Sequence, residues 1–312
     1  MNTPKVSILI PVYNREKFIK ECIESALAQT YRNIEIVIVD NASTDTTWDV
    51  INNYTQKDIR IKAFRNNKNI GPVKNWLACL EKATGLYTKI LWSDDLIHPL
   101  YLEQLVPYLD DSEIGFVFSS VKVFETNPKE TNSEIYQQNS TGIYNTNKYI
   151  EGALLNIGDF PVSPGCALFR TVDVKKNLLL DIPNKVNSNF PMHAIGNDLL
   201  LFLLTAKEYQ NFAIVCEPLS YFRSHNGSIT TSAPNGKIHL HYDLAKGYFS
   251  DIYDLNKNIQ KKLNTMFLSH TIKYDSKQWG IYSINDFHPL KKSIGFSYLY
   301  IFERIFKRIF TK

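Results

Sequence analysis

The first hundred residues alternate four times between a short apolar stretch rich in β-branched residues and a helical stretch with one apolar face. Short, polar connections separate the stretches. This pattern is typical of βαβ units, so we expect a mostly parallel sheet covered by helices. The expected strands are residues 5–12, 34–39, 59–65 and 87–92.

The rest of the chain continues with mixed elements. We expect a polar surface excursion at 125–145 and a loop at 226–236 that can close over a ligand. Between and beyond them, the apolar patterning predicts helices at 101–109, 148–156, 199–206 and 237–268 and from about 294 to the end, with strands at 114–124, 212–216 and 219–225.

Charge is unevenly distributed along the 312 residues. Residues 291–312 hold six basic residues and one acid, a balance of +5, so the remaining chain carries −1 of the total +4. The main body therefore has no basic excess that would favour nucleic acid. The longest apolar run is too short to span a bilayer, the start is expected to be a strand rather than a signal peptide, and the four scattered cysteines indicate neither a zinc site nor a disulfide framework.

Two adjacent acids, Asp94 and Asp95, follow the expected strand at 87–92. Ligands of open α/β sheets bind outside the carboxyl ends of the strands, and paired carboxylates there favour a hard divalent cation. The alternative is an acidic turn before the helix that Pro99 begins. No strand is followed by a glycine-rich phosphate loop, so a metal would have to neutralise the phosphates of a nucleotide.

Five stretches together resemble family 2 inverting glycosyltransferases with the GT-A fold, of the bacterial surface-polysaccharide type. They occur in that family's order and spacing, and the resemblance covers roughly residues 5–230. The stretches are residues 6–14, 38–45, 69–71, 92–95 and 221–225.

The resemblance implies a nucleotide site at the ends of the first strands. Pro11, Tyr13 and Asn14 would lie along the base and ribose, and Asp40 would accept a hydrogen bond from the base, most often uracil. Asn69 and Lys74 would touch the nucleotide. The structural alternatives are a strand end for Pro11, a ring packed on the sheet for Tyr13, and helix or turn caps for Asn14 and Asp40. For Asn69 the alternative is a loop residue, and for Lys74 it is a solvated helix residue.

The resemblance also implies the reacting groups. Asp95 would bind Mn²⁺ or Mg²⁺ on the diphosphate, and Asp94 would lie near ribose or sugar hydroxyls. Asp198 would be the base that deprotonates the acceptor, although an aspartate there can also cap a helix. Arg223 would steady the leaving group and His225 would bind metal or phosphate; a packed histidine is the alternative.

Two positions depart from the family's pattern. Asn197 stands where many relatives carry the first acid of a pair, and Trp92 stands where many carry an extra acid. The implied domains are a GT-A domain at 1–236, with a nucleotide-binding half at 1–110 and an acceptor-binding half at 111–236, and a helical extension at 237–312.

The implied reaction moves a sugar from a nucleoside-diphosphate sugar, most often a UDP-sugar, to a saccharide or lipid-linked saccharide in the synthesis of cell-surface polysaccharide such as O-antigen or capsule. We expect a cytoplasmic protein whose basic tail, 291–312, docks on the inner face of the membrane, although the tail could instead pack on its own domain or a partner. The alternatives are a sugar-phosphate nucleotidyltransferase and a non-catalytic sugar-binding or scaffolding relative.

Overall fold

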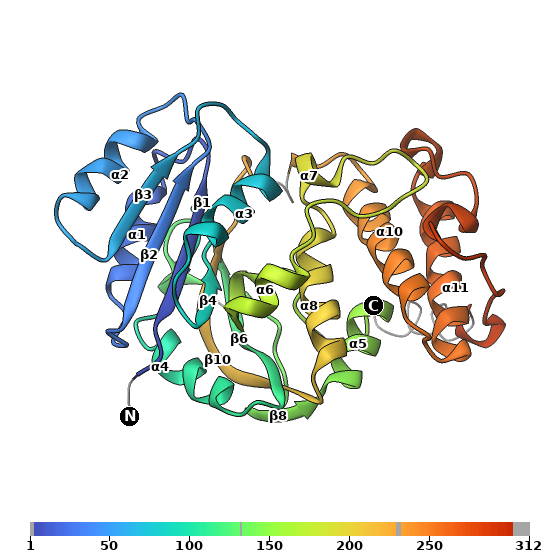
Figure 1. Ribbon diagram of the computed structural model, residues 1–312. Coiled ribbons are helices and arrows are strands. Elements are labelled where there is room, and N and C mark those ends of the chain that lie inside the picture. Colours follow the sequence, from blue (N-terminus) through green and yellow to red (C-terminus); the bar gives the residue numbers. More distant parts are fainter. Residues whose placement is uncertain (1–2, 132, 229–231, 302–312) are drawn as a thin grey trace.

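The computed structural model describes residues 3–131, 133–228 and 232–301. Within these ranges one ten-stranded sheet has the order β3-β2-β1-β4-β9-β6-β10-β5, while β7 pairs with β6 and β8 with β10. Figure 1 shows the sheet beside helices from the later part of the chain. The strands are β1 (Val6–Val12), β2 (Ile34–Asp40), β3 (Ile61–Arg65), β4 (Tyr87–Ile90), β5 (Leu96–Ile97), β6 (Ile114–Phe124), β7 (Glu134–Ile135), β8 (Gly142–Asn145), β9 (Ala167–Arg170) and β10 (Asn211–Arg223).

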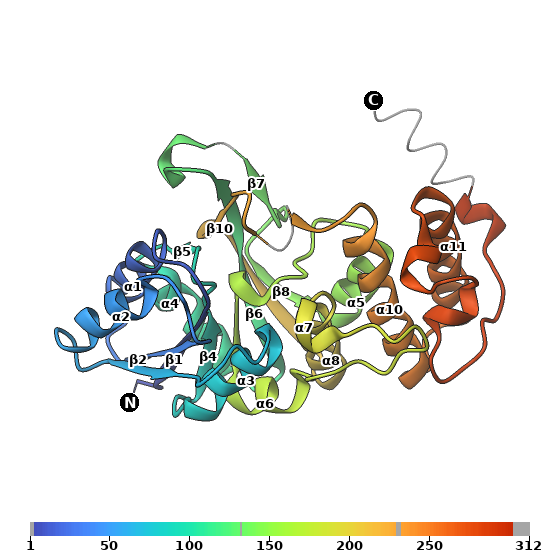
Figure 2. The same cartoon turned by 90° about the horizontal axis from the view of Figure 1, so that it is seen from above.

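The N-terminal half forms the alternating, parallel arrangement that the sequence predicts. β1 pairs in parallel with β2 and β4, and β2 pairs in parallel with β3. Ile8 and Ile10 of β1 pack with the helices of one face, and Leu9 packs on the other face, because successive strand residues point to opposite sides. Figure 2 shows the strands between α1 and α2 on one side and α3 on the other. These helices are α1 (Ile19–Leu27), α2 (Thr47–Thr55) and α3 (Pro72–Lys82).

The second half of the sheet is mixed. β6 and β10 are parallel, whereas β9 lies between β4 and β6 and is antiparallel to both. We predicted two strands at 212–216 and 219–225, which is wrong: β10 is one strand whose register shifts on either side of Pro218. A proline has no N–H for the ladder, so a bulge there keeps the strand continuous. The excursion at 125–145 also contains β7 and β8.

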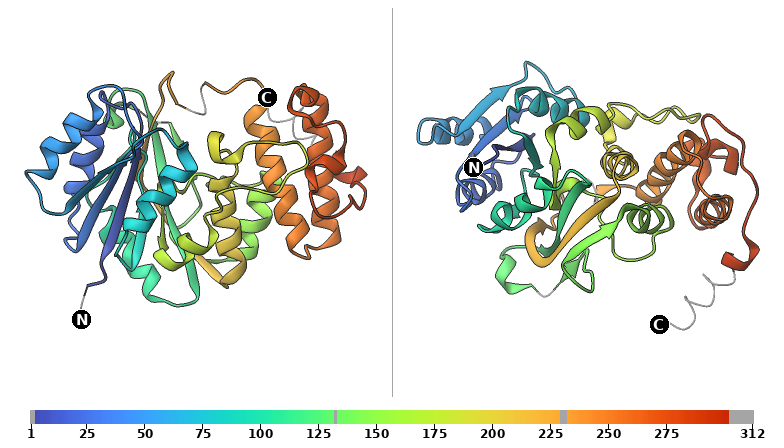
Figure 3. Two further views of the ribbon diagram at one scale, coloured as in Figure 1. Left: turned by 45° about the horizontal axis from the view of Figure 1, so that its top comes forward. Right: turned by 60° about the horizontal axis from the view of Figure 1, so that its bottom comes forward.

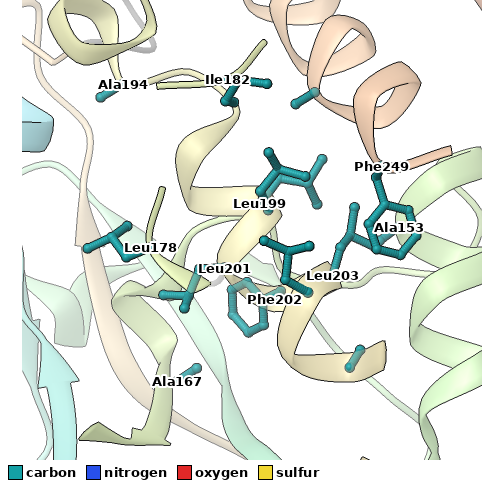
Figure 4. Packing of buried hydrophobic residues seen from close by; sticks show 14 of the residues in the cluster. Ala153, Ala167, Leu178, Ile182, Ala194, Leu199, Leu201, Phe202, Leu203 and Phe249 are labelled. Atoms are coloured by element: carbon teal, nitrogen blue, oxygen red, sulfur yellow. The ribbon is translucent and has the colours of Figure 1, made fainter. Parts of the chain in front are cut away.

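The later helices pack around α8, which lies between the sheet and α10 in both views of Figure 3. Figure 4 shows Leu203 of α8 close to Phe249 of α10 and Ala153 of α5. All of α8 from Asn197 to Ala206 is buried, so its sequence carries no polar face. These helices are α4 (Tyr101–Leu105), α5 (Thr146–Leu155), α6 (Thr171–Asn177), α7 (Phe190–His193), α8 (Asn197–Glu208), α10 (Lys237–Ile252) and α11 (Lys257–Lys273).

The C-terminal helices share one apolar core with the sheet. Leu244 and Phe267 belong to the same cluster of buried residues as Phe116 of β6. The helix expected at 237–268 is two helices, because the chain turns before Asn256, whose side chain accepts the N–H of Asn258 and starts α11. The division that we predicted at 236 falls in a connection between elements, but the core runs across it.

Five short 3₁₀ segments complete the described chain. They are η1 (Val106–Asp110), η2 (Pro128–Glu130), η3 (Pro164–Cys166), η4 (Ser276–Trp279) and η5 (Ile284–Phe287). Of the helix expected from about 294, residues 298–301 are helical and 302–312 lie outside the described residues. No helix in the described ranges is both long and apolar enough to cross a membrane.

Candidate active site

The acidic turn, residues 92–95, follows β4 at the carboxyl end of the sheet. The N–H of Asp95 donates to the carbonyl of Trp92 over 3.0 Å, which closes the turn. The Oδ1 atom of Asp95 accepts the backbone N–H of Arg223 at 2.8 Å, and Asp95 is buried. The turn is therefore held in place by the end of β10, which lies far away in sequence.

Asp94 joins three segments at the edge of the acidic turn. Its Oδ2 atom lies 2.8 Å from Nε2 of His225 and 3.4 Å from Nε of Arg15. Arg15 also donates from Nη2 to the carbonyl of Gly227, 3.4 Å away. The turn after β1, the acidic turn and the segment after β10 thus meet at one carboxylate.

Burial makes the acidic turn electrostatically unfavourable for two negative charges. The pKa of Asp95 is raised well above its usual range, first by burial and then by the neighbouring charge of Asp94. Lys89 of β4 is also fully buried; its Nζ atom donates to the carbonyl of Gly165 and lies 4.3 Å from the ring centre of Tyr101. Burial lowers the pKa of Lys89 to about 7. A cation at the turn would favour the ionised form of Asp95.

The residues at the acidic turn fit a divalent ion only if the donor supplies further ligands. In the part of the chain that the structure describes, no group of three or more His, Cys, Asp or Glu side chains is arranged to hold a metal. Mg²⁺ is commonly bound by one or two carboxylates together with substrate phosphates. Asp95 and Asp94 match that kind of site, because a bound cation would offset the repulsion between the two carboxylates.

Arg223 is engaged by the protein on several sides. Its Nη2 atom lies 2.5 Å from Oε2 of Glu21, its Nε donates to the carbonyl of Asp94 at 3.0 Å, and its guanidinium lies over the ring of Phe124. The side chain is only 5% exposed. In these contacts Arg223 braces the acidic turn, and its contact with a leaving group stays a prediction.

Asp40, at the end of β2, is fully buried, and its carboxylate contacts Ser43 and Arg65. Its carboxylate accepts the N–H of Ser43 at 3.2 Å and the Oγ hydroxyl of the same residue, and it lies 3.0 Å from Nε of Arg65. Arg65 closes the turn by donating to the carbonyl of Ser43 at 2.7 Å. Neither Ser43 nor Arg65 was predicted to contact Asp40, although Arg65 ends the neighbouring strand in register with Asp40.

The sequence allows Asn14 to cap the helix that follows, and this prediction is wrong. α1 begins only at Ile19, with Phe18 at its N-cap position. Asn14 instead adopts a left-handed conformation with φ 51°, and its Oδ1 atom accepts the N–H of Thr44 at 2.8 Å. The loops after β1 and β2 are thereby joined. Tyr13 beside it is 39% exposed, and Pro11 is buried in register with Val39.

Asn69 shapes the loop before α3. Its Oδ1 atom accepts from Nδ2 of Asn41 and from the N–H of Gly71, both at 2.9 Å. Gly71 has φ 86°, and a Cβ added there would come within 2.6 Å of Sδ of Met192, so this loop fits tightly against α7. Lys74 is exposed on the first turn of α3. The roles of Asn69 and Lys74 toward a nucleotide stay predictions.

Asp198 lies in the first turn of α8 and is 8% exposed. Gly196 occupies the N-cap position, so Asp198 is not the cap residue. Its Oδ1 atom accepts the N–H groups of Gly196 and Leu199, both at 2.9 Å, and its Oδ2 atom accepts the hydroxyl of Tyr242 at 2.7 Å. Burial outweighs these three hydrogen bonds and raises the pKa of Asp198 to about 6.

Asn197 is explained by its surroundings. Its Nδ2 atom donates to the carbonyls of Leu179 and Leu180, at 2.9 and 3.2 Å, in a fully buried position. A carboxylate at this position would face two carbonyl oxygens without a proton to donate. The amide is therefore the side chain that suits this backbone.

Asp198 and the acidic turn lie toward the same end of the molecule but make no direct contact among the described residues. In Figure 1 the carboxyl ends of β1 and β2 and the start of α8 lie toward the upper end. Between the two sites, Nε1 of Trp92 donates to Oγ of Ser163 at 2.9 Å, and η3, which follows Ser163, contacts α8. The structure thus links the acidic turn to helix α8 through η3.

At the acidic turn and at Asp198, three further residues were not predicted from the sequence. Arg15 directly follows the stretch at 6–14, which was a usable signal. Lys89 stands between Thr88 and Ile90 in a fully buried strand, and a charged residue in such a strand was a weaker signal. Tyr242 lies 44 residues from Asp198 along the chain and carried no local signal.

Comparisons with known proteins agree on one family. The model described as Glycosyl transferase family 2 matches residues 7–178. The putative glycosyltransferase EpsH of Bacillus subtilis is 37% identical over 138 residues, which cover 44% of this chain and 40% of EpsH. The Escherichia coli protein named UDP-Glc:alpha-D-GlcNAc-diphosphoundecaprenol beta-1,3-glucosyltransferase WfaP is 39% identical over 115 residues, 37% of this chain and 45% of WfaP. The matched part thus spans less than half of these relatives.

Solved structures share the fold at low sequence identity. Staphylococcus aureus TarS 1-349 in complex with UDP-GlcNAc superposes with a TM-score of 0.64 at 19% identity, covering 88% of this chain and 74% of TarS. The mannosyltransferase PcManGT of Pyrobaculum calidifontis, in complex with GDP-Man and Mn²⁺, gives 0.52 at 14% identity, covering 89% and 76%.

Proposed function

The chain belongs to glycosyl transferase family 2, and from this premise we propose that it transfers a sugar, with inversion, from a nucleoside-diphosphate sugar to an acceptor hydroxyl. The observation that carries the proposal is the placement of two acidic sites toward one end of the molecule. Asp94 and Asp95 follow β4, and Asp198 lies in the first turn of α8. An inverting displacement needs charge stabilisation at the leaving group and a base on the opposite side of the sugar.

The donor in this proposal is a UDP-sugar. Asp40 would accept the imide N–H of uracil, and Pro11, Tyr13 and Asn14 would line the base and ribose, with Asn69 and Lys74 beside the nucleotide. The carboxylate of Asp40 lies 3.0 Å from Nε of Arg65 at the carboxyl end of β2, the edge of the sheet at which the proposed nucleotide site lies. The printed names of WfaP and TarS, which mention UDP-Glc and UDP-GlcNAc, make uridine the first nucleotide to test.

The proposed cofactor is Mn²⁺ or Mg²⁺, and PcManGT is a relative in fold that holds Mn²⁺. Asp95 would hold the ion together with the donor's phosphates, and His225 is the further candidate ligand. When bound, the ion would stabilise the negative charge that develops on the departing diphosphate. Asp94 would accept hydrogen bonds from the ribose or the sugar, and Arg223 would keep the turn in position.

Asp198 is the proposed base. A carboxylate with a pKa of about 6 is mostly ionised at neutral pH, yet remains basic enough to take a proton from a hydroxyl as the new bond forms. The proton would move to Oδ2, because both lone pairs of Oδ1 are occupied by backbone N–H groups. The proposed acceptor is a saccharide or lipid-linked saccharide in cell-surface polysaccharide synthesis such as O-antigen or capsule. The printed name of WfaP includes a sugar linked to diphosphoundecaprenol, which supports the lipid-linked acceptor.

The direct test measures nucleotide release. Purified protein is incubated with UDP-sugars, singly, in Mn²⁺, Mg²⁺ or EDTA, with short saccharide acceptors. We expect UDP release that needs the metal and is abolished by Asp198→Asn. Pyrophosphate release from UTP and a sugar phosphate would indicate a nucleotidyltransferase instead, and donor binding without release under all conditions would indicate a non-catalytic relative.

We also propose peripheral binding to the inner face of the cytoplasmic membrane through residues 291–312. In the described part of this tail Tyr298 and Leu299 are 72% and 78% exposed, and Lys291 and Lys292 are exposed next to Leu290. Basic residues near an anionic surface contribute about 1 kcal/mol each. Deletion of 291–312 should abolish sedimentation with phosphatidylglycerol vesicles, and unchanged sedimentation would reject this role.

A further inference from the structure

We infer that Tyr242 of α10 is a positioning residue for Asp198, so that the C-terminal helices take part in catalysis. This inference rests on the proposed role of Asp198 as the base. It concerns a residue outside the stretches that resemble the family, in a part of the chain beyond the matched residues 7–178.

The hydrogen bonds of Asp198 determine which oxygen can react. Oδ1 accepts two backbone N–H groups, so both of its lone pairs are used. Oδ2 accepts the hydroxyl of Tyr242 at 2.7 Å, a hydrogen bond from another helix. One lone pair of Oδ2 therefore remains for an acceptor hydroxyl, and the bond from Tyr242 sets its direction.

α10 is fixed against the segment that carries the base. Gly196 has φ 115°, and a Cβ added there would lie 2.9 Å from Cβ of Ala245, so α10 approaches the chain closely at this point. One turn away, the rings of His241 and His193 lie 4.6 Å apart, edge to face. A phenol on α10 between these two contacts can move little relative to Asp198.

The titratable groups around Asp198 explain why the hydroxyl of Tyr242 affects the ionisation of its carboxylate. The titratable groups that affect it or are affected by it are Tyr242 of α10, Tyr136 next to β7 and Tyr149 of α5. All three are neutral phenols, and burial raises the pKa of each further. With no cation among these groups, the hydroxyl of Tyr242 is the side-chain donor that stabilises the ionised base.

The test compares Tyr242→Phe with Tyr248→Phe in the full chain. Tyr248 lies on the same helix, and the described residues give its hydroxyl no hydrogen-bond partner. We expect Tyr242→Phe to move the acidic limb of the kcat profile upward by about one pH unit, because the ionised form of Asp198 loses a donor. From a wild-type pKa of about 6, this shift lowers kcat about two-fold at pH 7 and about ten-fold well below pH 6. Tyr248→Phe should leave both unchanged.

An acidic limb that stays at its wild-type position in Tyr242→Phe would overturn the inference, since a merely structural loss lowers kcat without moving the limb. If Tyr242→Phe does not fold, 3-fluorotyrosine placed at position 242 replaces it. Its more acidic phenol is a stronger donor, so the limb should move to lower pH, and an unmoved limb would again overturn the inference.

A parallel measurement on Asp198→Asn separates this inference from the proposed function. Retained activity in Asp198→Asn would reject Asp198 as the base and with it both proposals. An inactive Asp198→Asn together with an unmoved limb in the position 242 variants would reject the role of Tyr242 alone.

Discussion

Nε2 of His225 lies 2.8 Å from Oδ2 of Asp94, and this contact ties the segment after β10 to the acidic turn after β4. Arg15 reaches the same oxygen from the turn after β1. The neighbouring Asp95 is buried, and its Oδ1 atom accepts the N–H of Arg223. The two adjacent acids thus have different environments: Asp94 is partly exposed and Asp95 is buried.

The burial of Asp95 leads to a prediction about metal dependence. Asp95→Asn should lower metal-dependent turnover at least about 100-fold and abolish the rise in melting temperature caused by Mn²⁺ plus UDP. Without metal the variant should melt at the same temperature as wild type or higher, because Asn still accepts the N–H of Arg223 and removes repulsion from Asp94. Enzyme assays and thermal unfolding measure both effects.

Asp254→Asn is the matched control for Asp95→Asn, since the side chain of Asp254 is fully exposed. It should change neither turnover nor the response to Mn²⁺. A full Mn²⁺ response in Asp95→Asn would show that the ion binds elsewhere.

The environment of Asp198 leads to a prediction about pH. Burial raises the pKa of this carboxyl to about 6, so the base is protonated and inactive below that value. We expect kcat/KM to be nearly constant above pH 7 and to fall about ten-fold per unit below pH 6. Initial rates in overlapping buffers test this, with circular dichroism at pH 5 to confirm folding. A rate that stays constant down to pH 5 would contradict the assignment.

The contact between Gly196 and α10 leads to a prediction about stability. Gly196→Ala places a Cβ 2.9 Å from Cβ of Ala245 at φ 115°, so it should destabilise the fold by about 2–4 kcal/mol and reduce turnover. Gly295→Ala is the matched control: its φ is 99°, but nothing lies within 4 Å of the added Cβ. Urea unfolding of both variants separates the steric clash from the backbone strain, and equal losses would show that the clash is relieved.

Glu35 leads to a prediction about acid stability away from the catalytic edge. It is buried in β2, where its carboxylate binds Nζ of Lys62 at 2.7 Å, Nζ of Lys5 at 2.9 Å and the hydroxyl of Ser7 at 2.7 Å. Burial alone would raise its pKa, but these bonds outweigh it and hold the pKa well below its ordinary value. Glu35→Gln should therefore cost about 2 kcal/mol at pH 7, a moderate loss because both lysines can regain water.

The sign of the pH effect of Glu35 follows from its lowered pKa. The stabilisation is complete above the ordinary pKa of about 4 and is lost as pH falls below it, since the unfolded chain takes up the proton more readily. The difference in unfolding free energy between wild type and Glu35→Gln should thus shrink below pH 4 in urea titrations. Turnover at pH 7 should stay within about two-fold, and a large loss of activity would show that Glu35 also supports the site.

The sequence by itself determined the elements whose signals are local. The alternation of apolar strands with helices predicted the parallel order around β1 and β2. This signal is local, because the hydrophobic pattern that marks each strand or helix is carried by consecutive residues. The acidic turn after β4 was equally visible, since it follows its strand directly. The break in β10 was misjudged for the same local reason: Pro218 interrupts the pattern, but pairing with β6 carries the strand across it.

Only the tertiary structure decided which distant side chains meet. Arg15 and His225 converge on Asp94, and Tyr242 reaches Asp198, because packing of whole elements brings them together. Such contacts depend on the position of α10 against α8 and of β10 beside β6, which apolar periodicity leaves open. The local sequence therefore identified the acids of the site, whereas the three-dimensional packing set their hydrogen bonds, their burial and the pKa values of the buried ones.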